Sequence, residues 1–400
     1  MSLNTLLSDY RQRSEERVVA VARAVAGRAP SLDARLREVG LDGPPTDLAG
    51  LDRMAVLSKD DLPRLTAERP FGGLLTEGSV AVRAFASPGP IYEAQPPGPD
   101  PWRWRRALEA CGIGPGDVVL NCFSYHLSPA GAMFDEGCQA LGATVVPAGV
   151  GMQEVQVRAI ADLGVTAYVG MPTYLSSLVE TYDAAGLPRD RWRLEKALVT
   201  AEPLPPELRA SLRERVPTVL MAYGTAEAGL IGHETAPDAG LHLDDGVFVE
   251  ICEPGTGEPV EAGKPGEVVV SVLHEDFPLL RFGTGDVSRW TQVDGVLGLA
   301  GVLGRVGAAV KVRGMFVHPH QAAEVLAALG TDGAAGGRFV VEHADGADVL
   351  YLDLVAAADA DRDGLAEAAA RRCRDALRIR PRVRFVDATE EGAVLEDRRR

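Results

Sequence analysis

The chain has 400 residues, of which 46% are hydrophobic and 24% are charged, and its formal net charge at pH 7 is -16. This length and composition predict a globular protein with a large core and two or three domains. The acidic balance, without a long cluster of Lys and Arg, excludes a nucleic-acid-binding surface. No run of about 18 apolar residues is present, so we expect no membrane association.

The amino-terminal stretch MSLNTLLSDYRQRSEERVVAVARAVAG lacks the apolar centre and cleavage site of a signal peptide, so we expect a cytoplasmic protein. Five cysteines without a CxxC pair predict reduced, buried thiols rather than disulfides or a cysteine zinc site. Residues 1 to about 70 predict helices that lead into the first domain, with Ser58 and Asp60 as candidate caps of a short helix.

Between residues of about 100 and 230, amphipathic helices that end near Gly or Pro alternate with short runs rich in Val, Ile and Leu. This alternation predicts a layered α/β domain whose parallel sheet is covered on both faces. From about 241 to 300 the pattern changes to short alternating strands joined by glycine-containing turns. That pattern indicates a distorted, β-barrel-like subdomain.

The last hundred residues form a separate pattern of strands with two helices, at 319–329 and about 362–377, which predicts a small α+β domain. Cys373 belongs to an apolar stripe with a four-residue repeat, so we expect it to pack in the core. We therefore predict a large N-terminal domain over residues 1–303 and a small C-terminal domain over residues 304–400.

Two stretches carry side chains suited to a nucleotide, AYGTAE at 222–227 and FGTGD at 282–286. Tyr223, followed by Gly224, can stack on a flat ring, Thr225 can bond a phosphate or carbonyl oxygen, and Glu227 can reach a Mg²⁺ ion. Asp286 can accept hydrogen bonds from ribose hydroxyls. Each stretch alone is also compatible with an ordinary strand and turn.

Three motifs, taken in order, resemble the adenylate-forming enzymes, in particular their phenylacetate-CoA ligase branch. The motifs are MAYGTAEAGLIG, RFGTGDVSRW and GRVGAAVKVRGMFVHPHQ. The resemblance covers nearly the whole chain from about residue 50. It implies a mobile small domain that rotates about the GRVG segment, where Gly307 is a free pivot.

The same resemblance implies roles for further residues. Arg305 would contact the ribose or a phosphate, and the turn at Arg313 and Gly314 would border a tunnel for the pantetheine arm of CoA or of a carrier protein. The stretch FSYHLSPAG matches an acyl-pocket segment. The predicted acyl-pocket residues are Tyr125, His126, Ala201 and Glu202.

The sequence departs from the family at two places that serve ATP. The stretch ASPGPIYEAQPPG at 86–98 replaces a loop of Ser, Thr, Gly and Lys that would hold the phosphates, and four prolines there lack an N–H group. Glu93 adds a negative charge to this stretch. Near the C-terminus, TEEGAVLEDRRR contains no lysine where family members place a catalytic one, and Arg398 to Arg400 look like a solvated tail.

Some relatives bind a structural zinc, but HETAPDAGLH offers only two histidines, so we predict no metal site.

These departures predict an acyltransferase that moves an acyl group, expected to be a small aromatic one, from CoA to the phosphopantetheine thiol of an acyl carrier protein without ATP. This reaction would suit secondary metabolism, such as antibiotic biosynthesis. His126 would act as the base for the thiol, and Thr225 would stabilise the oxyanion. An acyl-CoA thioester would be the substrate.

Two alternatives stay open. One is an ATP- and Mg²⁺-dependent aryl- or acyl-CoA ligase that forms an acyl-adenylate and then a CoA ester. The other is a catalytically inactive scaffold. The sequence leaves the acyl group undetermined, and a homodimer remains open as the oligomeric state.

Overall fold

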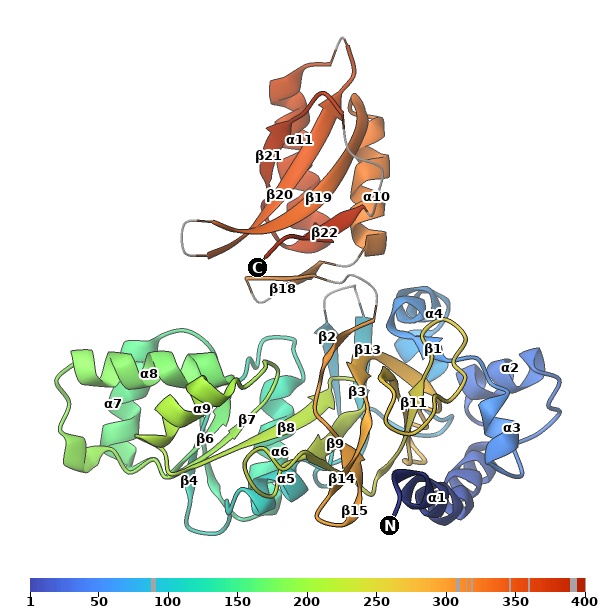
Figure 1. Cartoon of the computed structure of the whole chain (residues 1–400), viewed down its shortest axis with the longest axis vertical. Coiled ribbons are helices and arrows are strands. Elements are labelled where there is room, and N and C mark those ends of the chain that lie inside the picture. Colours follow the sequence, from blue (N-terminus) through green and yellow to red (C-terminus); the bar gives the residue numbers. More distant parts are fainter. Residues whose placement is uncertain are drawn as a thin grey trace. The chain divides into compact units, whose positions relative to one another are not determined.

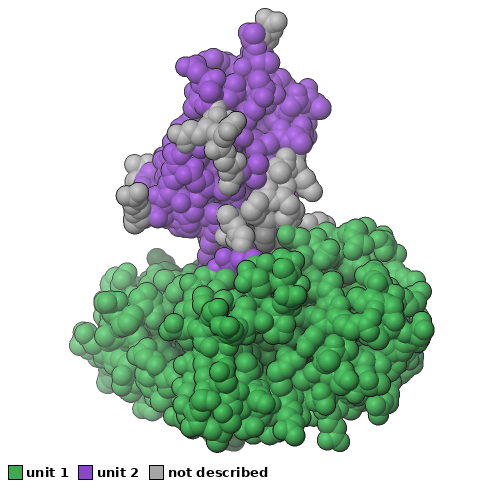
Figure 2. Space-filling view, turned by 45° about the vertical axis from the view of Figure 1, so that its right-hand side comes forward, with its two compact units in different colours: residues 1–304 green, residues 305–400 purple. Residues whose placement is uncertain are grey.

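The structure of the chain is a computed structural model. It describes residues 1–400 except 88–90, 307–309, 314, 318, 345–346, 359, 389–393 and 400. The chain divides into two compact units, Met1–Gly304 and Arg305–Arg400 (Figure 2). The division falls within the GRVG segment, and we describe each unit by itself.

The first unit is built on a large mixed sheet with the strand order β14-β15-β10-β9-β8-β7-β6-β4-β5 (Figure 1). The strands from β8 to β5 are parallel, and those from β8 to β14 are antiparallel. The bounds are β4 (Val118–Asn121), β5 (Thr144–Pro147), β6 (Ala167–Gly170), β7 (Lys196–Val199), β8 (Thr218–Thr225), β9 (Gly229–His233), β10 (Leu241–Leu243), β14 (Trp290–Val293) and β15 (Val296–Leu299).

Helices cover both faces of the parallel part because alternate residues of a strand point to opposite faces. Val119 and Leu198 pack with α5 and α6, whereas Leu120 and Val199 pack with α7, α8 and α9. This two-sided burial explains the apolar runs and confirms the predicted α/β class. The bounds are α5 (Arg105–Ala110), α6 (Ala130–Ala140), α7 (Gln153–Leu163), α8 (Pro172–Ala184), η3 (Arg189–Arg191) and α9 (Pro206–Arg213).

A second sheet, with the order β1-β13-β12-β11, lies where the sequence predicted a barrel-like subdomain. Strands β11, β12 and β13 are antiparallel, and the short β1 is added in parallel to β13. The N-terminal helices pack on this sheet, since Val18, Leu51 and Phe248 share one apolar cluster. The bounds are α1 (Leu3–Val25), α2 (Pro30–Glu38), α3 (Leu48–Asp52), β1 (Leu57–Ser58), η1 (Lys59–Asp61), α4 (Leu62–Glu68), η2 (Pro70–Gly73), β11 (Val247–Cys252), β12 (Gly266–Val272) and β13 (Phe282–Ser288).

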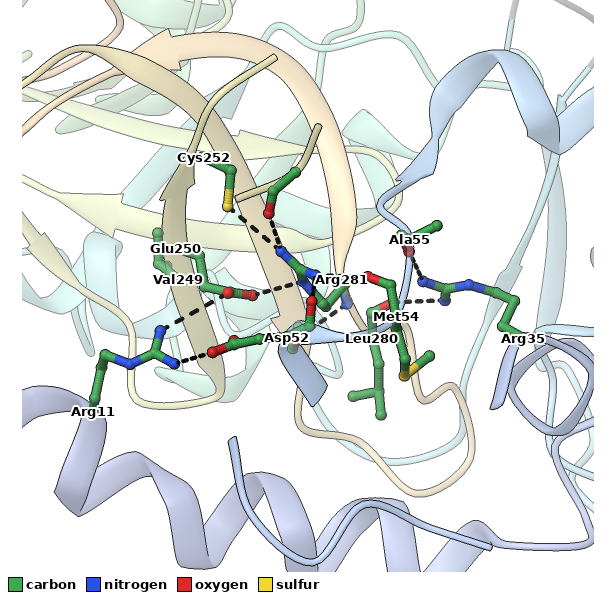
Figure 3. Close-up of polar contacts among 12 residues, drawn as sticks. Arg11, Arg35, Asp52, Met54, Ala55, Val249, Glu250, Cys252, Leu280 and Arg281 are labelled. Carbon is green, nitrogen blue, oxygen red and sulfur yellow. Dashed lines mark hydrogen bonds and ion pairs between the residues drawn. The ribbon is translucent and has the colours of Figure 1, made fainter. Parts of the chain in front are cut away.

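Arg281, one residue before β13, ties the N-terminal segment to this sheet (Figure 3). Arg281 is 1% exposed, and its guanidinium donates to the carbonyl oxygens of Asp52 at 2.7 Å and Met54 at 2.6 Å. It also donates to the Glu250 carboxylate at 3.3 Å and to the carbonyl of Gly257 at 2.5 Å. Arg281 therefore holds Asp52 and Met54, and Arg35 donates to the carbonyl of Ala55 at 2.7 Å, so two arginines hold the residues that lead into β1.

The stretch predicted to be an altered loop is largely a β-hairpin. Strands β2 (Arg83–Ser87) and β3 (Ile91–Gln95) pair in antiparallel fashion, from Arg83 opposite Gln95 to Ser87 opposite Ile91. The residues IYEAQ form the second strand of this hairpin. Only the connection at 88–90 lies outside the described residues.

The second unit is a sheet with the order β21-β20-β19-β22 and two accompanying helices, as the α+β pattern predicted. Cys373 is fully buried in its core, as expected. The predicted solvated tail is wrong for Arg399, whose guanidinium donates to the carbonyl of Lys311 at 2.6 Å and pairs with Asp348. The bounds are β16 (Gly304–Arg305), which spans the boundary, β17 (Val310–Val312), β18 (Met315–Val317), α10 (Pro319–Gly330), β19 (Ala334–Ala344), β20 (Ala347–Ala356), α11 (Arg362–Leu377), β21 (Arg382–Phe385) and β22 (Leu395–Asp397).

Within the described part of the chain, every helix is either too short or too polar to cross a membrane.

Candidate active site

The carboxyl ends of the parallel strands place the predicted site residues along one edge of the large sheet. Tyr125 and His126 follow β4, Ala201 and Glu202 follow β7, and Tyr223 lies near the end of β8. In open α/β sheets, ligands bind outside the carboxyl ends of the strands, in a crevice at the point where the strand order reverses. The fold therefore brings these predicted residues to the edge of the sheet where a ligand is expected.

Tyr223 and Asp286 meet although they come from different sheets. The Tyr223 hydroxyl lies 3.0 Å from Asp286 Oδ2 and 3.1 Å from Thr284 Oγ1. Thr284 donates to the carbonyl of Val268 at 2.9 Å, and both the tyrosine and the aspartate are less than 9% exposed. The hydroxyl thus orients a buried carboxylate beside an aromatic ring, which is the combination expected for a nucleoside pocket.

The turn after β8 is shaped by close packing. A Cβ atom at Gly224 would lie 2.8 Å from Trp104 Cζ2 and would also overlap the carbonyl of Gly229, so only glycine fits. Thr225 Oγ1 accepts a hydrogen bond from the N–H of Ala228 at 3.1 Å, which closes the turn. The hydroxyl that the sequence assigned to catalysis therefore also has a structural partner.

Glu227 forms an ion pair that the sequence did not predict. Lys59 Nζ lies 2.6 Å from Glu227 Oε1, and the glutamate side chain is 3% exposed. Burial acts to raise the pKa of Glu227, but the Lys59 ammonium outweighs it and holds this pKa below its ordinary value. Glu227 is therefore an ionised carboxylate, which is the form that binds Mg²⁺.

Lys59 reaches this position because β1 pairs with β13, the strand that carries Asp286. It opens η1, where Ser58 accepts from the N–H of Asp60 and the Asp61 carboxylate accepts from the N–H of Ser58. The sequence identified Ser58 correctly but named Asp60 in place of Asp61. The chain has only four lysines, and this scarcity is the one signal in the sequence that draws attention to Lys59.

Glu93, on β3, lies beside this ion pair. Both of its carboxyl oxygens accept from Ser87 Oγ, at 2.7 and 2.9 Å, and its side chain is buried. Burial, and next the negative charge of Glu227, raise the pKa of Glu93 to about 7. Glu93 and Glu227 line a small cavity of about 10 Å³, roughly the volume available to one water molecule.

Arg103 stabilises the turn that follows β8 through hydrogen bonds to its backbone. Its Nε donates to Asp244 at 2.8 Å, and its Nη2 donates to the carbonyls of Ala228 at 2.5 Å and Leu230 at 3.1 Å. It lines the same cavity as Glu93. Sequence reasoning missed this residue, because the partners of a buried arginine are visible only in three dimensions.

The acyl-pocket residues are separated along the sheet edge, since β6 lies between β4 and β7. The Tyr125 hydroxyl accepts from Asn121 Nδ2 at 2.8 Å, and Glu202 accepts from Thr173. His126 and Ala201 are exposed. Their roles in binding an acyl group stay predictions.

The hinge and tunnel residues lie at or beyond the boundary between the units. Arg305 is half-buried in β16, and Arg313 is exposed and donates to the carbonyl of Asp348 at 3.0 Å. Gly307 and Gly314 lie outside the described residues. Their roles also stay predictions.

Neither a thiol nor a metal cluster stands out as a further reactive group. Burial raises the pKa of the Cys122 thiol, which argues against its use as a covalent acyl carrier. Within the described ranges, no three His, Cys, Asp or Glu side chains are grouped so as to hold a metal ion.

A doubly covered parallel sheet with an aromatic ring, hydroxyls and carboxylates at its carboxyl edge is the architecture of a ligand-binding α/β enzyme. The profile of the AMP-binding enzyme family matches residues 104–272. The phenylacetate-coenzyme A ligase of Thermus thermophilus is 30% identical over 337 residues, which cover 80% of this chain and 75% of that protein. The enzyme of the same name from Pseudomonas putida is 28% identical over 331 residues, with 78% and 74% covered.

A solved structure of 2-hydroxyisobutyryl-CoA ligase in complex with 2-HIB-AMP and CoA has the same fold, with a TM-score of 0.81 and 21% identity. The match covers 98% of this chain and 90% of that chain. The chain belongs to the adenylate-forming (AMP-binding) enzyme family, in its phenylacetate-CoA ligase branch. The predicted resemblance is thereby confirmed, and the chain is a CoA-ligase-like protein.

Proposed function

We propose that the chain is an acid–thiol ligase that activates a carboxylic acid, expected to be aromatic, with ATP and joins it to CoA. The first step forms an acyl-adenylate and pyrophosphate, and the second transfers the acyl group to the CoA thiol and releases AMP. The hydrogen bond between Tyr223 and Asp286 carries this proposal, because it builds the nucleoside half of a site that a simple thioester exchange does not require. The relatives named above act as ligases, which supports the same reading.

The roles of the residues follow from their chemistry. The ring of Tyr223 would border the adenine, and Asp286 would accept hydrogen bonds from the ribose hydroxyls. Glu227, an ionised carboxylate beside Thr225, fits as a ligand of the Mg²⁺ that accompanies phosphates. Tyr125 would flank the acyl group.

For the thiol step, His126 would remove the proton from the CoA thiol, whose free pKa is near 8.5. Arg305 would contact the ribose or a phosphate, and Arg313 would border the pantetheine arm of CoA. Thr225 is the last residue of β8, the strand that carries Tyr223, and its hydroxyl would bond an oxygen of the acyl-phosphate.

The test is to incubate the full chain with an aromatic acid such as phenylacetate or benzoate, CoA, Mg²⁺ and ATP, and to follow CoA ester and AMP by mass spectrometry. We expect both products in equal amounts and none without ATP. Formation of neither product with a broad panel of acids would favour an inactive scaffold.

A second candidate is the ATP-independent acyltransferase, and the buried Glu93 beside Glu227 favours it because it places negative charge next to the phosphates. In this reaction a carrier-protein thiolate attacks the carbonyl of an acyl-CoA, a new C–S bond forms, the old one breaks, and the CoA thiolate leaves and takes up a proton. Intact-mass measurement of a phosphopantetheinylated carrier protein incubated with benzoyl-CoA separates the two. Acylation without ATP would support the transferase.

A further inference from the structure

Glu93 is an unusual residue in the proposed nucleotide site. It lies on the hairpin strand β3, is buried, and lines, together with Glu227, a cavity with room for about one water molecule. Its carboxyl group is held by Ser87, whose hydroxyl is a neutral donor. Glu93 therefore adds a second carboxyl group, beside that of Glu227, to the region next to the turn after Thr225.

The charges that face this cavity do not balance the pair of carboxyls. The Lys59 ammonium is bound to Glu227 at 2.6 Å. Arg103 also lines the cavity, but its guanidinium is directed to Asp244 and to the carbonyls of the turn. His274 lines it as well, and burial lowers the pKa of this histidine, so that it is mainly neutral at pH 8.

A nucleoside triphosphate would bring several further negative charges to this region, whereas a nucleoside monophosphate or an acyl-adenylate would bring only one. Like charges at a separation of a few ångströms in a partly shielded site repel strongly. The nucleoside half of the site, at Tyr223 and Asp286, is common to all of these ligands.

We propose that Glu93 is a specificity-determining residue that weakens the binding of the β- and γ-phosphates of ATP, so that the site prefers AMP or an acyl-adenylate to ATP. This inference rests on the proposed function, because it places the nucleoside at Tyr223 and the phosphates toward Glu227.

The test measures direct binding of AMP and of ATP to the intact chain by calorimetry at pH 8, with and without Mg²⁺. The variant Glu93→Gln keeps the size of the side chain and removes its charge, and Glu93→Ser provides a second variant if the glutamine does not fold. Glu136→Gln is the matched control, because Glu136 accepts hydrogen bonds from Arg83 and Gln95 of the same hairpin. Thermal unfolding verifies that each variant is folded.

We expect the wild-type chain to bind AMP more tightly than ATP. Glu93→Gln should tighten ATP binding by about tenfold or more while AMP binding changes by less than about twofold, and Glu136→Gln should change neither. An unchanged ratio of the two affinities in Glu93→Gln overturns the inference and leaves the proposed function standing.

Weaker binding of ATP in Glu93→Gln, seen only with Mg²⁺, also overturns the inference, because it would make Glu93 a metal ligand. Equal tightening of AMP and ATP overturns it too, since the effect would then act on the nucleoside pocket. If neither nucleotide binds to wild type or variant, the nucleoside site itself is refuted, and the proposed function falls together with the inference.

Discussion

The replacement of Arg281 by methionine is the sharpest test of how this fold supports its site. Methionine keeps much of the length and apolar character of the side chain but removes every donor. The carbonyls of Asp52, Met54 and Gly257 would lose a hydrogen-bond donor, and the Glu250 carboxyl would lose its closest cation.

The magnitude follows from burial. Arg281 is 1% exposed and Glu250 is 2% exposed, so water cannot replace the lost partners without local opening. Removal of one member of a buried ion pair typically destabilises a protein by about 3–5 kcal/mol, and the stranded carbonyls add to this loss. At pH 8, where the Glu250 carboxyl with its pKa of about 7 is mainly ionised, we therefore expect Arg281→Met to lower the free energy of unfolding of the first unit by at least about 3 kcal/mol.

Urea unfolding followed by tryptophan fluorescence measures this change. All four tryptophans of the chain lie in the first unit, so the signal reports on that unit alone. Arg35→Met is a matched control, because Arg35 donates to the carbonyls of Leu280 and Ala55 in the same region without a carboxylate partner within its hydrogen bonds (Figure 3). A loss below about 1 kcal/mol in Arg281→Met, or no more than in the control, would refute the reasoning.

Three further predictions concern the same unit. Burial raises the pKa of Glu250 to about 7, above its unfolded value near 4.3, so its contribution to stability is present at low pH and is lost as the pH rises through 7. Between pH 4.5 and 8, unfolding measurements should therefore show that wild type loses up to about 3 kcal/mol relative to Glu250→Gln. Tyr223→Phe removes the hydroxyl that orients Asp286 and should weaken AMP binding by about tenfold, measured by calorimetry. Gly224→Ala places a methyl group against Trp104 and should lower the free energy of unfolding by about 1–3 kcal/mol.

Controls keep these predictions specific. Thermal unfolding verifies that Tyr223→Phe is folded at the assay temperature, and equal AMP affinity would contradict the nucleoside pocket. Gly114→Ala is the control for Gly224→Ala, because a Cβ atom there meets open space. Parallel pH profiles of wild type and Glu250→Gln would show that Glu250 is not the group responsible.

The layered fold could be predicted because its signals are local and repeated. Apolar runs bounded by amphipathic helices indicate strands that are buried on both faces. Val119 and Leu120 illustrate this, because these neighbours on one strand pack into the apolar clusters on opposite faces of the sheet. The stripe that includes Cys373 indicated a core-facing helix for the same reason. The hairpin at β2 and β3 was not predicted. The prolines and the similarity in position to a phosphate-binding loop were stronger signals than the pattern of the five residues of β3.

The site was harder to predict because its contacts join distant parts of the chain. Tyr223 and Asp286 were both named, but their mutual hydrogen bond depends on how two sheets meet. Lys59 was overlooked because the N-terminal helices were taken as a lead-in, and its partner Glu227 lies far along the sequence. No local pattern reports such a pair.

The position of Lys59 links the stability of the N-terminal segment to the chemistry of the site. Arg281 holds the residues before β1, β1 pairs with β13, and η1 then begins at Lys59, within 2.6 Å of Glu227. If Arg281 is lost, the segment before β1 loses its donors to Asp52 and Met54, and we expect the ammonium that keeps Glu227 ionised to be held less firmly. Arg281→Met should therefore weaken ATP-dependent activity more than Arg35→Met does at matched folded fractions, because only the former removes the donor to both Met54 and the β11 carboxylate.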